Sequence, residues 1–263
     1  MSWPLTGVFA QTRLPSTDVC RAEPIGAARV SAVADGRSFL LEDGREIRLP
    51  GIEVPPPPRG GETGARAEAG STARAALTVL LAGQTVELRQ RAPAADRYGR
   101  SLAHAYFMHE GAQKSAAHAM LDQGFARVSA HVGNVACASE LLSREAAARK
   151  AKLGLWGEAY YAIVGAESPA GLLAERGHFT VVEGRILSVR ESAGTIYMNF
   201  GRRWSQALTV TILKRNERSF VAAGLDPRGL ANRRVRVRGW MDERNGAPRI
   251  EAMRPEQIEI AER

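Results

Sequence analysis

The sequence predicts an α+β protein, made mainly of β-strands, that is organised as two consecutive small β-barrels. Short stretches of alternating apolar and polar residues recur between turn residues, three helical stretches lie within the first series, and a second series of strands begins after residue 177. We therefore expect a leader at 1–26, a first domain at 27–157, a linker with at most one short helix at 158–177 and a second domain at 178–263.

The strands of the first domain are expected at residues 28–33, 38–42, 46–49, 85–89 and 100–107. Asp35-Gly36 and Asp43-Gly44 supply tight turns between the first three strands. Residues 51–64 contain four consecutive prolines and several glycines, so this segment is expected to be a long surface loop.

Three helices are expected in the first domain. One covers residues 65–81, a second lies near 116–121 and stops at Gly124, and a third covers 136–153 and stops at Gly154. Strands followed by helices in this order predict a small barrel with the helices packed at one end.

The second domain is expected to contain strands at residues 179–189, 195–200, 208–213, 234–240, 249–252 and 257–260, with a helix at 217–223. Three strands, a helix and two more strands is the order of an OB-fold. Such barrels commonly present one face to single-stranded nucleic acid.

The composition is that of a globular, soluble protein, with 44% hydrophobic and 24% charged residues in a chain of 263. No apolar run approaches the ~20 residues that a membrane helix needs, so no membrane partner is expected. The first 19 residues lack the basic start and long apolar core of an intact signal peptide. These residues are either a flexible leader or what remains of an export signal that was trimmed. The localisation of the protein therefore stays open.

Only two cysteines occur, Cys20 and Cys137, so cysteine alone can form neither a zinc site nor a disulfide framework. Two unpaired thiols and a single bridge in an exported protein both remain possible interpretations.

Positive charge is concentrated in the last third of the chain. The formal net charge is +8, of which residues 1–175 contribute +1 and residues 176–263 contribute +7. A basic excess of this kind favours a polyanionic partner over a solvated basic surface with no partner, and nucleic acid is the partner that we expect.

Four segments of the first domain resemble the staphylococcal nuclease (thermonuclease) family in order and spacing. They are VADGRS at 33–38, IRLPGIEVP at 47–55, DRYGR at 96–100, and GFA at 124–126 with GLW at 154–156. The resemblance covers residues 27–157 and implies a phosphodiester hydrolase that acts on DNA or RNA. Each motif alone is weak, but four in register are specific.

The resemblance implies a catalytic set of Arg48, Glu53 and Arg100, in which the two arginines hold the phosphate and neutralise the charge of the transition state. Asp35, Arg37 and Tyr98 stand at motif positions and are expected to support the phosphate or its ligands. His104 and His131 lie in the same domain, but a lone histidine is more often structural, and neither is assigned a role.

The sequence departs from the family where the family binds calcium. Arg37 stands in place of one ligand aspartate, Pro56 in place of the glutamate that acts on water, and Glu53 in place of the other aspartate. Calcium needs several oxygen ligands, so we expect no metal ligands and no cofactor. Three alternatives follow: cleavage without metal, a divalent site rebuilt with Glu62 or Glu68, or a catalytically inactive protein that binds nucleic acid.

In the second domain, aromatic and basic side chains alternate over the second and third expected strands, which is typical of sequence-tolerant single-strand binding. The residues expected to bind are Arg190, Tyr197, Arg202, Arg203, Trp204, Lys214 and Arg215. Arg234, Arg236 and Arg238 alternate along one strand and are expected to form a basic stripe.

Overall fold

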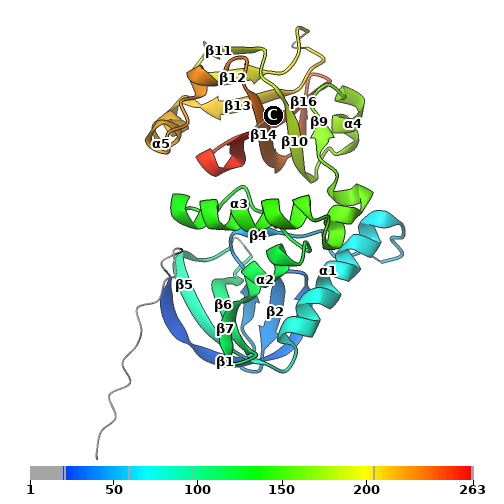
Figure 1. Cartoon of the computed structure of the whole chain (residues 1–263), viewed down its shortest axis with the longest axis vertical. Coiled ribbons are helices and arrows are strands. Elements are labelled where there is room, and N and C mark those ends of the chain that lie inside the picture. The colour runs from blue at the N-terminus through cyan, green and yellow to red at the C-terminus, as the bar shows by residue number, and fades with distance from the viewer. Residues whose placement is uncertain (1–19, 21, 59, 97, 204, 262–263) are drawn as a thin grey trace, which may run out of the picture.

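Two hydrophobic cores hold the chain together, and Figure 1 shows the parts of the chain that surround them one above the other along the longest axis. The computed structural model describes residues 20, 22–58, 60–96, 98–203 and 205–261. Buried side chains between Cys20 and Tyr161 form the first core, and buried side chains between Ala166 and Ile258 form the second. We call the parts of the chain around these cores the first and the second unit; the boundaries of the two domains stay a prediction.

The first unit is a closed barrel of five strands with additional short strands. Its main sheet has the order β3-β2-β1-β5-β6-β7, and a parallel pairing of β3 with β6 closes the barrel. The strands are β1 (Glu23–Asp35), β2 (Ser38–Leu41), β3 (Glu46–Arg48), β5 (Thr85–Ala95), β6 (Ser101–His109) and β7 (Ala112–Ser115), with β4 (Ile52–Glu53) paired to β8 (Arg127–Val128). All five expected strands are confirmed, and β4, β7 and β8 are additions. The strand β4 corrects the prediction of a surface loop at 51–64, because residues 51–55 are buried.

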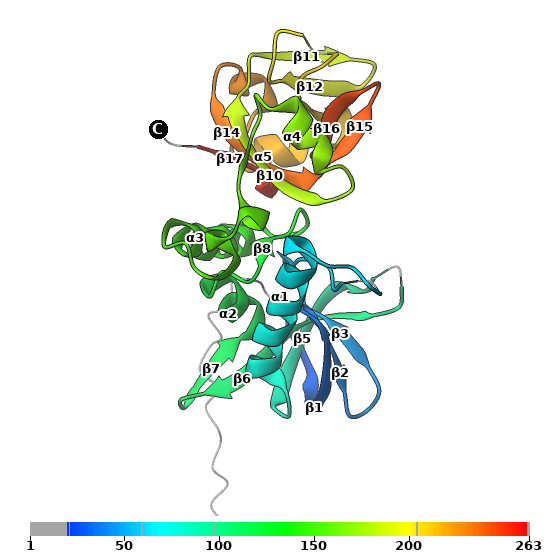
Figure 2. The same cartoon turned by 90° about the vertical axis from the view of Figure 1, so that its right-hand side faces the viewer.

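The three expected helices of the first unit are confirmed as α1 (Ala65–Leu81), α2 (Ala116–Asp122) and α3 (Val135–Lys150). Figure 2 shows α1 running along the barrel. A Cβ atom at Gly36 would lie 2.8 Å from Cβ of Ala73 on α1, and one at Gly70 would lie 2.0 Å from the carbonyl oxygen of Pro56. Glycine at these two positions therefore lets α1 approach both the β1–β2 turn and the proline loop.

Cys20 and Cys137 form a disulfide bond, which decides between the two interpretations of the sequence. Both residues are buried, and the bond joins the segment that precedes β1 to α3. The end of the expected leader is thus part of the first unit, because residues 23–26 belong to β1. Its residues 1–19 lie outside the described part of the chain.

The second unit consists of two sheets that face each other across the second core. One has the order β17-β14-β10-β9 and the other the order β11-β12-β13-β16-β15. Their strands are β9 (Val164–Gly165), β10 (Phe179–Arg185), β11 (Ser188–Ser192), β12 (Thr195–Asn199), β13 (Thr209–Leu213), β14 (Arg234–Trp240), β15 (Asp242–Arg244), β16 (Ala247–Glu251) and β17 (Ile258–Ile260). The expected strand 179–189 is divided at Ile186-Leu187, where the chain passes from one sheet to the other.

Residues 158–177, expected to be a linker, pack into both cores. Tyr161 is buried in the first core, whereas β9 pairs with β10 and Leu172 of α4 (Pro169–Ala174) is buried in the second. The expected helix near 217–223 is confirmed as α5 (Glu217–Ala222). In the described part of the chain, none of the helices combines the length and the apolar character of a membrane span.

The second unit is fixed to the first through α3, which lies between them in Figure 1. The guanidinium of Arg238 on β14 is fully buried and donates to Glu145 of α3 at 2.7 Å and 3.1 Å, and it also donates to Glu259 of β17. Glu256 accepts hydrogen bonds from the backbone N–H groups of Val132 and Gly133. Ion pairs and hydrogen bonds therefore connect the two units, and the pair of Arg238 with Glu145 is fully buried.

This interface corrects the prediction of a basic stripe on β14. Arg234, Arg236 and Arg238 do alternate along the strand, but Arg234 and Arg236 pair with Glu183 of β10 and Arg238 is buried against α3. The sequence pattern gave the correct periodicity, and it could not indicate that this face would meet carboxylates of two other elements.

Candidate active site

The β1–β2 turn and β3 bring together Asp35, Ser38 and Arg48. In the barrel, Ser38 pairs with Asp35 across the turn and with Arg48 across β2–β3. The Arg48 guanidinium donates to the Ser38 hydroxyl at 3.1 Å and lies 3.7 Å from the Asp35 carboxylate. Asp35 therefore orients Arg48, and it also accepts the backbone N–H of Arg37 at 2.8 Å.

Arg100 reaches the same end of the barrel because β3 and β6 run in parallel there, with Arg48 opposite Leu102. Asp96 holds Arg100 through hydrogen bonds from the guanidinium at 2.7 Å and from the backbone N–H at 3.1 Å. Burial would raise the pKa of Asp96, but the hydrogen bond from Arg100 and two backbone N–H groups lower it, so this carboxylate stays charged.

Arg37 is locked against Glu53. Its guanidinium donates to the Ile52 carbonyl oxygen at 2.6 Å and to Oε1 of Glu53 at 2.5 Å. Both side chains are largely buried, with 13% and 9% of their surfaces exposed. Among the described residues we find no hydrogen bond to Oε2 of Glu53, so this oxygen is the one that can interact with a bound molecule.

Arg37, Arg48 and Arg100 form one cluster of positive charge, in which Arg37 and Arg48 act on Glu53 and Arg100 acts on Arg48. Burial lowers the pKa of the Arg48 guanidinium, and the charges of Arg37 and Arg100 lower it further. Burial raises the pKa of the Glu53 carboxyl, while the charges of Arg37 and Arg48 act against this rise. A phosphate that entered this cluster would relieve the repulsion among the guanidinium groups.

Sequence reasoning missed Arg127, which lies beside Glu53. The two residues are partners in the antiparallel β4–β8 pair, and Arg127 is buried with 4% of its surface exposed. Its guanidinium lies 4.4 Å from the ring centre of Tyr161 and 5.2 Å from that of Phe179 in the second unit. The sequence did contain a signal for this residue, because Arg127 directly follows the GFA segment within an otherwise apolar run.

Residues 46–158 match the family model described as staphylococcal nuclease homologue. The chain contains a staphylococcal nuclease domain. A comparison with curated proteins gives no significant match. Three of the four sequence segments fall inside the matched range, and the fourth, VADGRS at 33–38, precedes it but meets Arg48 in space.

The side chains of this nuclease domain do not fit the calcium ion of the family. The Arg37 guanidinium takes both the Ile52 carbonyl and one oxygen of Glu53, which are the kind of oxygen atoms that calcium would need. Pro56 carries no carboxylate, and Glu68 is exposed on α1. Within the described ranges, no three His, Cys, Asp or Glu side chains gather closely enough to hold a metal ion.

The remaining candidates of the nuclease domain lie at the edge of the cluster or away from it. Tyr98 is 68% exposed, and its ring centre is 5.3 Å from the Arg100 guanidinium. His104 lies opposite Arg89 in the β5–β6 pair, and the charges near His131 are those of Arg254 and Glu256. Neither histidine is thus placed to serve Arg48 and Glu53.

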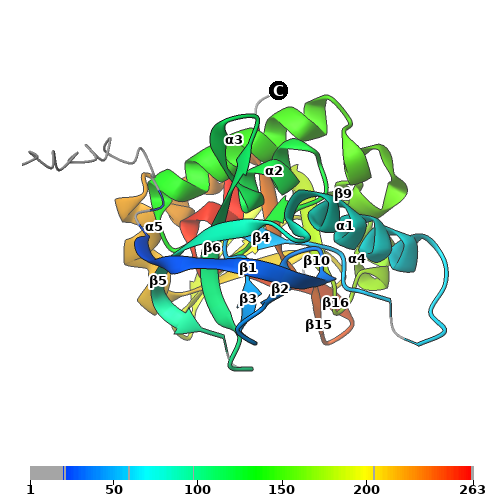
Figure 3. The same ribbon diagram turned by 90° about the horizontal axis from the view of Figure 1, so that it is seen from below.

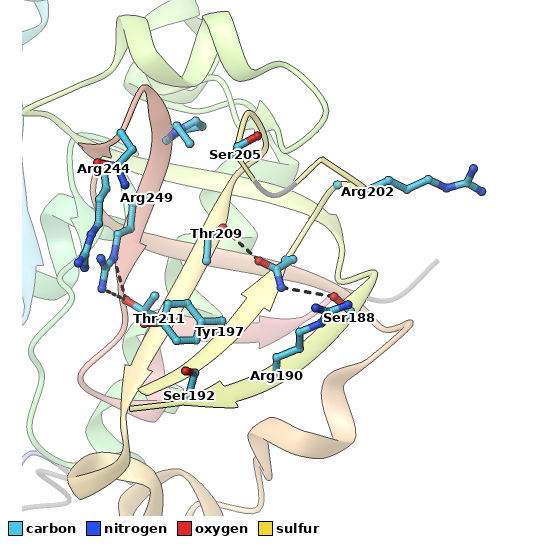
Figure 4. Close-up of a pocket in the computed structure, with 15 residues that line it drawn as sticks. Ser188, Arg190, Ser192, Tyr197, Arg202, Ser205, Thr209, Thr211, Arg244 and Arg249 are labelled. Carbon is cyan, nitrogen blue, oxygen red and sulfur yellow. Dashed lines mark hydrogen bonds between the residues drawn. The ribbon is translucent and has the colours of Figure 1, made fainter. Parts of the chain in front are cut away.

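In the second unit, three of the seven expected binding residues line one hollow of about 580 Å³ on the outer face of the β11–β15 sheet. Arg190, Tyr197 and Arg202 belong to it, as Figure 4 shows. Lys214 instead pairs with Glu191 and Glu217. Arg203 and Arg215 are exposed outside the lining, and Trp204 lies outside the described residues.

Two further arginines of this hollow, Arg244 and Arg249, come from the β15–β16 hairpin and were not expected. The sequence signal for this hairpin is Asn245-Gly246, a pair that favours two-residue hairpin turns. In the structure both residues have the positive φ angles that such a turn requires, 53° and 80°. The sequence prediction contained β16 without its hairpin partner.

Proposed function

We propose that the protein is a nuclease that hydrolyses phosphodiester bonds of DNA or RNA without a metal ion. A staphylococcal nuclease domain indicates a function related to nucleic acid. The observation that carries the more specific proposal is the cluster of Arg37, Arg48 and Arg100, in which Arg37 pairs with the buried carboxylate of Glu53.

In this proposal Arg48 and Arg100 bind the non-bridging oxygens of the phosphate. A guanidinium presents two parallel N–H donors that match two phosphate oxygens, and it neutralises the charge that grows in the five-coordinate transition state. Asp35 and Asp96 fix the two side chains before substrate binds, so little ordering is needed at the moment of reaction.

Glu53 takes the proton of the attacking water. The water oxygen forms a bond to phosphorus, its proton passes to Oε2 of Glu53, and the bond from phosphorus to the leaving oxygen breaks, with a proton from solvent completing the new hydroxyl. Arg37 holds Oε1 and replaces the divalent ion as the positive charge next to this carboxylate. Burial raises the pKa of Glu53, which makes it a stronger base than an exposed glutamate.

The test is turnover of labelled single- and double-stranded DNA and RNA by purified protein. We expect cleavage of at least one substrate, loss of most of it in Arg48→Ala, and wild-type turnover in Arg45→Ala. Arg45 is a matched control because it lies just before β3, is exposed and pairs with Asp43. Absence of cleavage by demonstrably folded protein, or full turnover by Arg48→Ala, would contradict the proposal.

A second candidate is a nuclease-like protein that binds nucleic acid without cleaving it. It is favoured by the position of Arg37, which neutralises Glu53, and by Pro56, which supplies no base. Tight, salt-dependent binding with no turnover of any substrate would support this candidate over the enzyme.

Export is the localisation that we propose, because disulfide bonds persist in oxidising compartments and Cys20 and Cys137 are joined. Thiol alkylation in denaturant of protein isolated from its native source without reductant should label neither cysteine, and labelling of both would contradict export.

A further inference from the structure

The hollow on the second unit is built around a row of side chains that crosses its sheet. Arg190 of β11 lies opposite Tyr197 of β12, and Tyr197 lies opposite Thr211 of β13. Arg249 of β16 continues the row, since its guanidinium donates to the Thr211 hydroxyl at 3.1 Å and 3.2 Å. Figure 4 shows the Tyr197 ring between Arg190 and Arg249.

Most of the remaining lining side chains are polar and neutral or basic, and Gly201, Ala247 and Pro248 complete the lining. Asn199 links two hydroxyls, since it accepts from Thr209 at 3.2 Å and donates to Ser188 at 3.3 Å. None of the described residues that line the hollow is acidic. The site therefore offers hydrogen bonds and positive charge on a surface with one aromatic ring.

Among the residues that the structure describes, the arginines of the hollow lack the carboxylate partners that six other basic side chains of the second unit have. Within the described part of the chain, Arg190, Arg202, Arg244 and Arg249 make no ion pair. Six other basic side chains of the second unit do pair with carboxylates, namely Arg176, Lys214, Arg228, Arg234, Arg236 and Arg238. Four arginines without a described carboxylate partner line this one hollow, which indicates a ligand that carries several negative charges.

We infer that this hollow is a binding site for single-stranded nucleic acid. Its arginines would hold successive phosphates, and the face of Tyr197 would stack one base, which is possible only where the bases are unpaired. A volume of about 580 Å³ lies in the range of sites that hold small molecules, so the hollow can take a short stretch of nucleotides. Binding would tolerate sequence, because stacking and phosphate contacts do not read base edges.

The position of the hollow also fits delivery of the strand to the nuclease domain. In Figures 2 and 3, β15 and β16 lie on the same side of the molecule as β2 and β3, which carry Ser38 and Arg48. A strand held by Arg244 and Arg249 can thus continue towards the arginine cluster without passing around the protein. This delivery step rests on the proposed nuclease function, whereas binding in the hollow does not.

The test is fluorescence anisotropy with labelled oligothymidylate and oligouridylate of about 12 nucleotides, within the range of ~4–16 nucleotides for one barrel. The background is the full-length Arg48→Ala protein, so that cleavage does not interfere. We expect Arg190→Ala/Arg244→Ala to raise Kd at least about tenfold and to reduce the slope of log K against log salt by about 0.7 for each lost phosphate contact. Tyr197→Leu should raise Kd at least about fivefold and leave that slope unchanged.

The matched control is Arg185→Ala/Arg234→Ala, which removes the same charge from an exposed pair of residues on β10 and β14. It should bind like the parent protein. Equal losses in both double variants, or duplex and heparin bound as tightly as the single strand, would overturn the inference. Binding by the hollow without turnover by the wild type would leave the inference intact and remove only the nuclease proposal.

Discussion

Replacing Glu53 with glutamine is expected to lower kcat by at least about 10²-fold, with a smaller effect on KM. A positioned general base typically contributes about 10²–10⁴-fold, and glutamine keeps the size and the oxygen atom that accepts the bond from Arg37 while it removes the basic group. Steady-state kinetics on the best substrate measure the change. Glu42→Gln is the control, because Glu42 is exposed and pairs with Arg29.

The pH dependence separates a base from a structural carboxylate at this position. Since burial raises the pKa of Glu53, the carboxylate takes up its proton at a higher pH than an exposed glutamate, whose ordinary value is 4.5. The acid side of the kcat/KM profile should therefore lie above 4.5, with activity lost as the pH falls through the raised pKa. A profile that is unchanged in Glu53→Gln would exclude Glu53 as the base.

Replacing Arg238 with methionine is expected to lower the free energy of unfolding by about 3–5 kcal/mol. The substitution leaves Glu145 fully buried with only the guanidinium of Arg149 and the backbone N–H of Val128 as partners. Breaking a buried ion pair from one side costs this amount because one charge stays desolvated. Urea unfolding followed by circular dichroism measures it.

Arg234→Met is the matched control, since Arg234 lies on the same strand and its ion pair with Glu183 is exposed on the arginine side. Its cost should stay below about 1 kcal/mol, the usual limit for a surface pair. The double variant Glu145→Gln/Arg238→Met should recover part of the loss. An equal cost for Arg238→Met and Arg234→Met would show that the interface does not depend on the buried pair.

The barrel and the helices could be predicted because their signals are local. Helix α1 was expected at its observed bounds, since Gly64 and Gly83 flank a run rich in alanine and leucine. The division of the expected strand 179–189 could not be foreseen, because the bend at Ile186-Leu187 is set by the two sheets that receive its halves. Likewise, the face of β14 that carries Arg238 is buried only because α3 brings Glu145 to it.

The candidate site was predictable where a motif marks it and unpredictable where the fold assembles it. Arg48, Glu53 and Arg100 come from motif positions, and the barrel places their charges within mutual influence. The bond of Arg37 to both Ile52 and Glu53 follows from the approach of the β1–β2 turn to β4, which no local pattern contains. Arg249 likewise gains its place from a parallel pairing of β13 with β16.

The dependence of cleavage on metal tests the central claim most directly. Purified protein is incubated with its best nucleic-acid substrate in excess EDTA, and then with calcium, magnesium or manganese restored one at a time. We predict that the rate in EDTA equals the rate with added metal, because the Arg37 guanidinium occupies the oxygens that calcium would need. Activity that EDTA abolishes and calcium specifically restores would contradict this account, and it would mean that carboxylates such as Glu62 or Glu68 rebuild a metal site.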